Sequence, residues 1–178
     1  VYKRQDQLIR DAVLEALKPL LEDAETAKVG QHLKYDANVL ANHGITLRGI
    51  HDDTMLESYI LDAAGSRHDL DTLALKYLGQ RTIHFEDIAG KGAKQLTFNQ
   101  VPIEQAAPYA AEDAEVTLRL HQMLSEKLNQ APSLSTLYRE LEMPLVPVLS
   151  RIERNGALVC RDTVSYTHLT LPTKCWVE

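Results

Sequence analysis

Apolar residues recur every three or four positions along most of this chain, a period that predicts amphipathic helices. Residues 28–31 and 47–51 are shorter and have the composition of β-strands. Capping residues, chiefly aspartate before a helix and glycine after it, mark several helix ends. Helices are therefore expected over residues 6–21, from residue 35 or 36 to Gly44, from Asp53 through Ile60, from Asp69 to Gly79, around residues 85–88, and over residues 103–128 and 134–154.

Two strands make a poor sheet for so many helices, because an α/β domain needs enough strands to cover the apolar faces of its helices. The sequence therefore predicts an α/β fold that is mostly helical because its N-terminal strands are missing. Helices left without a sheet would expose apolar faces. Residues 131–133 are typical of a linker, and the helix after them is expected to be interrupted at Pro144 and Pro147 and to stop at Gly156.

The longest predicted helix carries an aspartate on its apolar side, and Pro108 is expected to kink or restart it. Charged residues such as Glu115 and Arg119 fall on the opposite side. A carboxylate among apolar side chains is costly unless it is paired or bound to a metal, and Arg67 is a candidate partner. The stripe that predicts the core-facing side comprises Ala106, Ala110, Asp113, Thr117, Leu120, Leu124 and Leu128.

The composition bounds the compartment and the partners. No apolar run is long enough to span a membrane and no secretory signal is present, so a cytoplasmic protein is expected, with no membrane and no obligate protein partner. Cys160 and Cys175 give neither a disulfide framework nor a metal-ligand spacing. A net charge of −6 disfavours an extended duplex-binding surface, but it is compatible with a short single strand held at a metal site.

Two-metal hydrolysis of a phosphodiester needs several carboxylates that converge on cations about 3.5–4 Å apart. Asp36 and Asp113 are candidates for such ligands, and the phenol of Tyr109, one helical turn from Asp113, could orient the attacking water. Each residue also has an ordinary structural explanation. Asp36 could cap a helix, and Tyr109 could be a core aromatic with its hydroxyl at the surface.

Residues 31–36, Gln-His-Leu-Lys-Tyr-Asp, and residues 109–113, Tyr-Ala-Ala-Glu-Asp, together resemble the second and third motifs of the proofreading 3′–5′ exonucleases. More narrowly, they resemble the exonuclease domain of bacterial DNA polymerase I, the family A polymerases. The resemblance extends to residues 53–61 and 88–92. Residues 141–156 resemble the opening of the family A polymerase domain.

The resemblance implies a ribonuclease-H-like fold and a role for each matching residue. Asp36 and Asp113 match metal ligands, and Tyr109 matches the tyrosine that positions the attacking water. Two Mg²⁺ ions are expected in the intact domain, with Mn²⁺ or Zn²⁺ as alternatives. The implied partner is the single-stranded 3′ end of DNA, and the residues that match DNA-binding positions are Gln31, His32, Tyr35, Arg67 and Phe85.

Ordinary explanations remain open for three of these DNA-binding residues. Phe85 would stack on the terminal bases, or it would form a small local core under its loop. Arg67 would meet phosphate and Tyr35 would lie beside the DNA, or both would belong to a solvated surface.

The chain departs from the family pattern at two points. His32 stands where the pattern has asparagine, which would make any contact with phosphate depend on pH. The first family motif, an Asp-x-Glu on an early strand, is expected to have no counterpart here. Only half of the ligand set is then present, and we expect the chain by itself to show little or no catalysis.

Both ends of the chain carry segments that resemble the translated adapter of a transposon-based sequencing library. One oligonucleotide can encode residues 1–5 on one strand and the start of residues 164–178 on the other. We therefore expect four parts: residues 1–5 and 164–178 as adapter-like artefacts, residues 6–130 as a partial exonuclease domain, and residues 131–163 as the start of a polymerase domain.

Three functions are consistent with the sequence. The first is a piece of a DNA polymerase I, whose parent removes mismatched 3′-terminal nucleotides and synthesises DNA in replication and repair. The second is a ribonuclease D-like exonuclease, which the polymerase-like residues 142–156 disfavour. The third is a catalytically silent nucleic-acid-binding or structural domain, which the presence of Asp36, Tyr109 and Asp113 disfavours for the parent.

Overall fold

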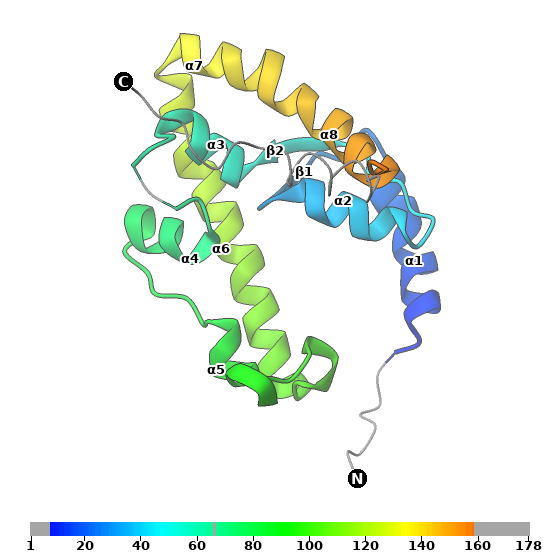
Figure 1. Cartoon of the computed structure of the whole chain (residues 1–178). Coiled ribbons are helices and arrows are strands. Elements are labelled where there is room, and N and C mark those ends of the chain that lie inside the picture. The colour runs from blue at the N-terminus through cyan, green and yellow to red at the C-terminus, as the bar shows by residue number, and fades with distance from the viewer. Residues whose placement is uncertain (1–7, 66, 159–178) are drawn as a thin grey trace, which may run out of the picture.

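A computed structural model describes residues 8–65 and 67–158, and the two adapter-like segments and Cys160 and Cys175 lie outside this part. The fold is mostly helical around a small parallel sheet (Figure 1). Within this part of the chain no helix is long and apolar enough to cross a membrane. The elements are α1 (Arg10–Glu22), β1 (Lys28–Gly30), α2 (Leu33–Ala41), β2 (Ile50–Asp53), α3 (Thr54–Leu61), α4 (Leu70–Leu73), the π-turn η1 (Ala74–Leu78), α5 (Phe85–Ala89), the 3₁₀ turns η2 (Gly92–Lys94) and η3 (Phe98–Gln100), α6 (Ile103–Asn129), α7 (Pro132–Leu137), the π-turn η4 (Tyr138–Glu142) and α8 (Met143–Asn155).

The sheet brings the starts of two helices together. Strands β1 and β2 are parallel, with Val29 opposite Asp52 and Gly30 opposite Asp53. A bulge between Lys28 and Val29 leaves His51 without a partner in the register. Because the strands are parallel, their carboxyl ends meet at one edge of the sheet, and α2 and α3 both begin there.

A single carboxylate caps both helices at this edge. One Asp53 oxygen accepts from the backbone nitrogens of Met55 and Leu56 in α3, at 3.0 and 3.5 Å. The same oxygen accepts from the nitrogen of His32 at 3.0 Å, and the other accepts from Leu33 at 2.7 Å, at the start of α2. The expected cap on α3 is therefore confirmed, and Asp53 also fixes the helix that carries Asp36.

Helix α2 begins at Leu33, two or three residues earlier than the sequence predicts. The residue before the helix is His32, which has a left-handed backbone with φ 62°. Asp36 lies in the first turn of α2 and is not its cap, so the capping explanation for Asp36 is wrong. The capping oxygen comes from Asp53, which is 20 residues away in the sequence. Capping rules consider only the residues next to a helix and so do not predict it.

Asparagine tolerates the left-handed backbone at position 32 better than histidine, because its short side chain crowds the backbone less. We expect His32→Asn to raise the free energy of unfolding by about 0.5 kcal/mol, measured by urea denaturation. His43→Asn, at a residue of ordinary φ just after α2, is the matched control. An equal effect of the two substitutions would contradict this explanation.

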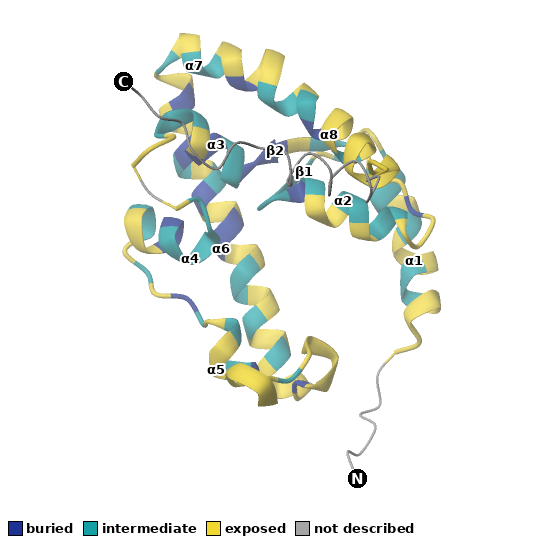
Figure 2. Ribbon diagram, in the orientation of Figure 1, coloured by how far each residue is buried: buried dark blue, intermediate teal, exposed yellow. Residues whose placement is uncertain are grey.

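The hydrophobic core lies along the second half of α6. Val116, Leu120 and Leu124 are buried there with Leu73 and Ala74, and partly buried Leu61, Leu70, Tyr77 and Leu78 pack around them. The stripe predicted from the sequence is correct from Thr117 to Leu128, all buried. Nearer the N-terminus, Ala110 is exposed and Asp113 is half-buried. Figure 2 shows exposed and intermediate positions along this half of α6. Pro108 lies within the continuous helix and does not restart it.

Helix α1 illustrates the predicted excess of apolar surface. The apolar residues on one face of the helix expected over residues 6–21 include Leu8, Ile9 and Leu17. These three residues are 83%, 75% and 44% exposed. The helix has no buried residue, and in Figure 2 it shows only intermediate and exposed positions. Other large apolar side chains, such as Leu118 on α6, are also half-exposed. The expected helix is therefore present, and the expectation that helices left without a sheet expose apolar faces is confirmed for it.

The C-terminal helices pack on the rest of the chain without the expected linker. Pro132 begins α7, and the π-turn η4 precedes α8, in whose first turn Pro144 lies. The π-turn accommodates Pro144, which has no backbone N–H to continue the helical ladder. Helix α8 lies against α2, where Asn38 donates to Glu153 at 2.9 Å and accepts from Ser150 at 2.6 Å. The expected stop at Gly156 is confirmed.

Candidate active site

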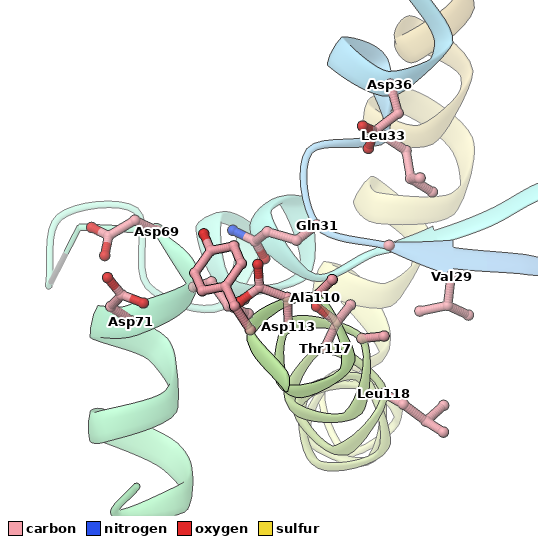
Figure 3. Close-up of a pocket in the computed structure, with 14 residues that line it drawn as sticks. Val29, Gln31, Leu33, Asp36, Asp69, Asp71, Ala110, Asp113, Thr117 and Leu118 are labelled. Carbon is pink, nitrogen blue, oxygen red and sulfur yellow. The ribbon is translucent and has the colours of Figure 1, made fainter. Parts of the chain in front are cut away.

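A cavity of about 760 Å³ opens at the carboxyl end of β1, between α2, α4 and the first half of α6 (Figure 3). In sheets of parallel strands this edge is where ligands usually bind. Four of the site residues expected from the sequence line it: Gln31, Asp36, Tyr109 and Asp113. The two expected metal ligands therefore face one space, although 77 residues separate them in the sequence (113 minus 36).

Asp113 and Tyr109 interact directly on one face of α6. The Tyr109 hydroxyl and the Asp113 carboxylate are hydrogen-bonded, as expected for residues one helical turn apart. Burial raises the pKa of Asp113, and the hydrogen bond from Tyr109 partly offsets that rise. Burial and the neighbouring Asp113 charge raise the pKa of the Tyr109 phenol. Tyr109 is therefore a neutral hydrogen-bond donor at the site near neutral pH.

Asp36 lines the cavity from the first turn of α2. Although the residue as a whole is exposed, loss of water around its carboxyl raises the pKa of Asp36. The nearby His32 lowers this pKa and the charge of Asp53 raises it. A carboxylate that is short of water and lies in an acidic cavity is one that a cation would stabilise.

Three aromatic rings pack together near α5, and one of them, Tyr109, lines the cavity. Phe85 lies 6.3 Å from the Tyr109 ring and 6.4 Å from that of Phe98, and Phe98 lies 6.1 Å from Tyr109, all measured between ring centres. Phe85 thus has the local packing that one explanation predicted, and its contact with Tyr109 also places it beside the cavity. Phe98, 47% exposed, was not singled out from the sequence, because it lies in a polar loop.

A second cavity of about 540 Å³ gathers Gln31, His32 and Arg67, three of the expected DNA-binding residues. Gln31 lines both cavities, and its amide donates to the carbonyl of His68 at 2.7 Å. Arg67 is largely exposed and pairs with Asp69 at 3.1 Å, so it is not the buried partner considered for Asp113. Tyr35 is 62% exposed, with its ring 6.0 Å from that of His32.

Two further carboxylates line the first cavity and were not predicted as site residues. The sequence predicts only a helix cap at Asp69. The cap is confirmed, because Asp69 accepts from the Thr72 nitrogen at 3.0 Å, and the residue also lines the cavity. Asp71 accepts from the Thr82 hydroxyl at 2.6 Å and lies 2.7 Å from the His84 ring. The Asp71 charge also contributes to the raised pKa values of Tyr109 and Asp113. The spacing of Asp69 and Asp71 on a short helix gave no signal of this.

The ligand set around Asp36 and Asp113 is incomplete. Among residues 8–65 and 67–158, neither belongs to a cluster of three metal-ligating atoms within 4.8 Å of one another. The chain does contain one Asp-x-Glu spacing before β1, at Asp23 and Glu25, in the loop after α1. Asp23 there accepts from the Glu25 nitrogen and the Thr26 hydroxyl and does not line the cavity, so it does not supply the first motif.

A sequence profile of 3′–5′ exonuclease domains matches residues 2–129 of the chain. The chain belongs to the 3′–5′ exonuclease family. DNA polymerase I of Pseudomonas aeruginosa is 70% identical over 156 residues, covering 86% of this chain and 17% of that protein. DNA polymerase I of Rhizobium leguminosarum is 48% identical over 157 residues, covering 88% of this chain and 15% of that protein.

The solved POL domain of Pol1 from M. smegmatis, in complex with DNA primer-template and dNTP, matches with a TM-score of 0.69 at 26% identity. The match covers 91% of this chain and 24% of that one. The family and this likeness confirm the ribonuclease-H-like exonuclease fold, here mostly helical with a small parallel sheet. The chain spans 15–17% of the length of these curated relatives, and their naming as DNA polymerase I disfavours the ribonuclease D-like alternative.

Proposed function

We propose that this chain is the exonuclease segment of a DNA polymerase I, and that its larger cavity receives the single-stranded 3′ end of DNA. The observation that carries the proposal is the lining of one cavity by Asp36, Tyr109 and Asp113. Membership of the exonuclease family and the similarity to DNA polymerases I support it. The parent would remove mismatched 3′-terminal nucleotides and synthesise DNA in replication and repair.

The exonuclease family uses divalent metal, and the donors in the cavity fit a hard cation. Asp36 and Asp113 offer carboxylate oxygens, the ligands that Mg²⁺ prefers, and we infer that they would hold it. Two bound Mg²⁺ ions would activate water and stabilise the leaving oxygen. Tyr109, fixed by its hydrogen bond to Asp113 and by the Phe85 ring, would orient the attacking water.

The residues around the second cavity would hold the strand. Arg67 is exposed and carries the charge that phosphate needs, and Gln31 lies at the border between the two cavities. The exposed Tyr35 lies next to His32, and Phe85 would offer a ring face to terminal bases of any sequence. Both cavities together would accommodate a short single strand.

The chain by itself should hydrolyse DNA poorly, because two carboxylates without further ligands bind Mg²⁺ weakly. The experiment therefore uses a chimaera, in which this chain replaces the segment of Pseudomonas aeruginosa DNA polymerase I that aligns with it. We expect the chimaera to release labelled nucleotides from the 3′ end of a single strand, and the chain alone to release them at close to the background rate.

Asp113→Asn in the chimaera is expected to lower nucleotide release by at least about 100-fold, because it removes a metal ligand. Glu112→Gln, one residue away and hydrogen-bonded to the Ile83 nitrogen at 2.7 Å, is the matched control and should keep most of the activity. DNA synthesis by both variants, measured in parallel, shows that they fold. Undiminished 3′ hydrolysis by folded Asp113→Asn would overturn the proposal.

Tyr109→Phe in the same chimaera removes one hydroxyl and keeps the ring that packs on Phe85. We expect about a tenfold slower release of nucleotides, with an unchanged KM for the single strand, because the lost hydrogen bond orients water and does not bind DNA. The measurement is steady-state hydrolysis of the labelled strand. A raised KM with an unchanged kcat would instead assign Tyr109 to DNA binding.

A further inference from the structure

A second group of ligating side chains lies away from the cavity, where β2, α3 and α6 meet. Asp52 begins the buried half of β2, Glu57 lies on α3 and His121 lies on α6. Asp52 and Glu57 are 1% and 0% exposed, and the His121 side chain is 19% exposed. None of the three lines the cavity that holds Asp36 and Asp113.

The three side chains converge on one point. One ligating atom from each residue lies within 4.8 Å of the other two, the only such cluster among the described residues. His121 lies between the two carboxylates, with Nδ1 2.9 Å from Glu57 Oε1 and Nε2, the ring's other nitrogen, 3.7 Å from Asp52 Oδ2; only one of these nitrogens would bind the ion. Two ligands of one tetrahedral zinc ion are about 3.3–3.6 Å apart, given zinc bonds of about 2.0–2.2 Å.

One oxygen in this cluster lacks a partner. Glu57 is fully buried, and its Oε2 atom accepts no hydrogen bond. A buried carboxylate oxygen without a partner costs free energy, so a native structure that contains one needs a reason for it. A bound cation would supply the missing partner.

The other contacts of Asp52 leave room for a ligand role. Its Oδ1 accepts from the Tyr138 hydroxyl at 3.2 Å and pairs with Arg139 at 2.8 Å, whereas Oδ2 faces the two imidazoles, His51 Nδ1 at 2.5 Å and His121 Nε2 at 3.7 Å. One oxygen is thus engaged by the C-terminal segment, and the other points toward His121. The Arg139 and His51 side chains are themselves 43% and 61% exposed, so Asp52 contacts both the core and the surface.

We propose that Asp52, Glu57 and His121 form a binding site for a zinc-like divalent cation, distinct from the nuclease site. A mixed set of one imidazole and two carboxylates suits Zn²⁺ or Co²⁺ better than Mg²⁺, which prefers oxygen ligands alone. The ion would join β2, α3 and α6, and through the Asp52 contacts with Tyr138 and Arg139 it would also stiffen the attachment of α7 and α8. Its role is structural.

The test uses the full chain, stripped of metal by a chelator and titrated with Co²⁺, whose visible absorption reports bound nitrogen and oxygen ligands. We expect one tightly bound Co²⁺ per chain, displaced by Zn²⁺, and a binding constant lowered by at least tenfold in Glu57→Gln and His121→Gln. Glu115→Gln, at an exposed residue of α6 outside both sites, is the matched control and should bind this ion as the unaltered chain does.

Amide chemical shifts of the unaltered chain, recorded with and without Zn²⁺, keep the test decisive if either variant fails to fold. The expected result is a set of shifts centred on Asp52, Glu57 and His121. Shifts centred instead on Asp36 and Asp113, or on exposed histidines such as His43, would overturn the proposal, as would the absence of any saturable binding. Equal Co²⁺ binding by folded Glu57→Gln and the unaltered chain would also overturn it.

Discussion

Replacing Asp53 by alanine is expected to lower the free energy of unfolding by about 2–4 kcal/mol. The carboxylate accepts from the first backbone nitrogens of α2 and of α3, so one substitution removes the caps of two helices. Leu33 is buried, and its N–H would lose its partner without gaining water in exchange. The measurement is urea denaturation followed by circular dichroism.

Asp69→Ala is the matched control, because Asp69 caps only the short helix α4, by accepting from the Thr72 nitrogen and hydroxyl. That loss should cost about 1 kcal/mol. The difference between the two variants measures the double role of Asp53. If both substitutions lower stability equally, Asp53 does not link the two helices in solution, and the position of Asp36 must be fixed in another way.

The stability of the metal-free chain is expected to fall by about 2 kcal/mol as the pH rises from about 6.5 to 8. Burial, together with the charge of Asp52, raises the pKa of Glu57 from 4.5 to about 8. A carboxyl whose pKa is raised in the folded state contributes stability that is complete below its unfolded value of 4.5 and is lost as the pH rises toward 8.

His121 acts in the opposite direction, because burial lowers its pKa below 6.5. Its contribution is complete above the unfolded value of 6.5 and is lost as the pH falls through the folded value. Just below pH 6.5 the two slopes oppose each other, and above pH 6.5 only the Glu57 slope acts. Urea denaturation at several pH values, with a chelator present, measures the profile.

Glu57→Gln should remove the decline above pH 6.5, because the amide has no proton to lose in that range. The control is Glu115→Gln, an exposed residue of α6. A decline that persists unchanged in Glu57→Gln would show that another group in the buried cluster is responsible.

The sequence predicts best where local rules decide the structure. The caps at Asp53 and Asp69 follow from short-range hydrogen bonds, and the stop at Gly156 follows from the freedom of glycine at a helix end. The C-terminal half of the α6 stripe follows from a 3.6-residue period, and its residues are buried in the hydrophobic core. These features need no knowledge of distant residues.

The sequence predicts the structure poorly where residues far apart in the chain determine a helix start, the burial of a face or a residue of the site. Helix α2 starts at Leu33 because Asp53, from a neighbouring strand, supplies its cap. The periodicity of α1 predicts the helix but not how far its apolar face is covered: Val13 and Leu14 are half-buried, whereas Leu17 and Leu20 are 44% and 53% exposed. Asp71 lines the cavity from the short helix α4, and Phe98 packs on Tyr109 from the 3₁₀ turn η3, and elements this short carry no periodic signal.

The candidate site divides in the same way. The positions of Asp36, Tyr109 and Asp113 on one cavity could be expected from the family motifs, since spacing alone does not relate residues that are so far apart in the chain. The cluster of Asp52, Glu57 and His121 could not be expected, because each member looks like an ordinary polar residue until the sheet and two helices bring them together.

The most direct test of the nuclease site is the binding of Mn²⁺ by the chimaera, with the free ion counted by electron paramagnetic resonance. Mn²⁺ takes the same carboxylate ligands as Mg²⁺ and is visible in this measurement. If Asp36 and Asp113 hold the metal, Asp36→Asn and Asp113→Asn should each weaken Mn²⁺ binding by at least about tenfold relative to the unaltered chimaera. Unchanged Mn²⁺ binding in both folded variants would contradict the assignment.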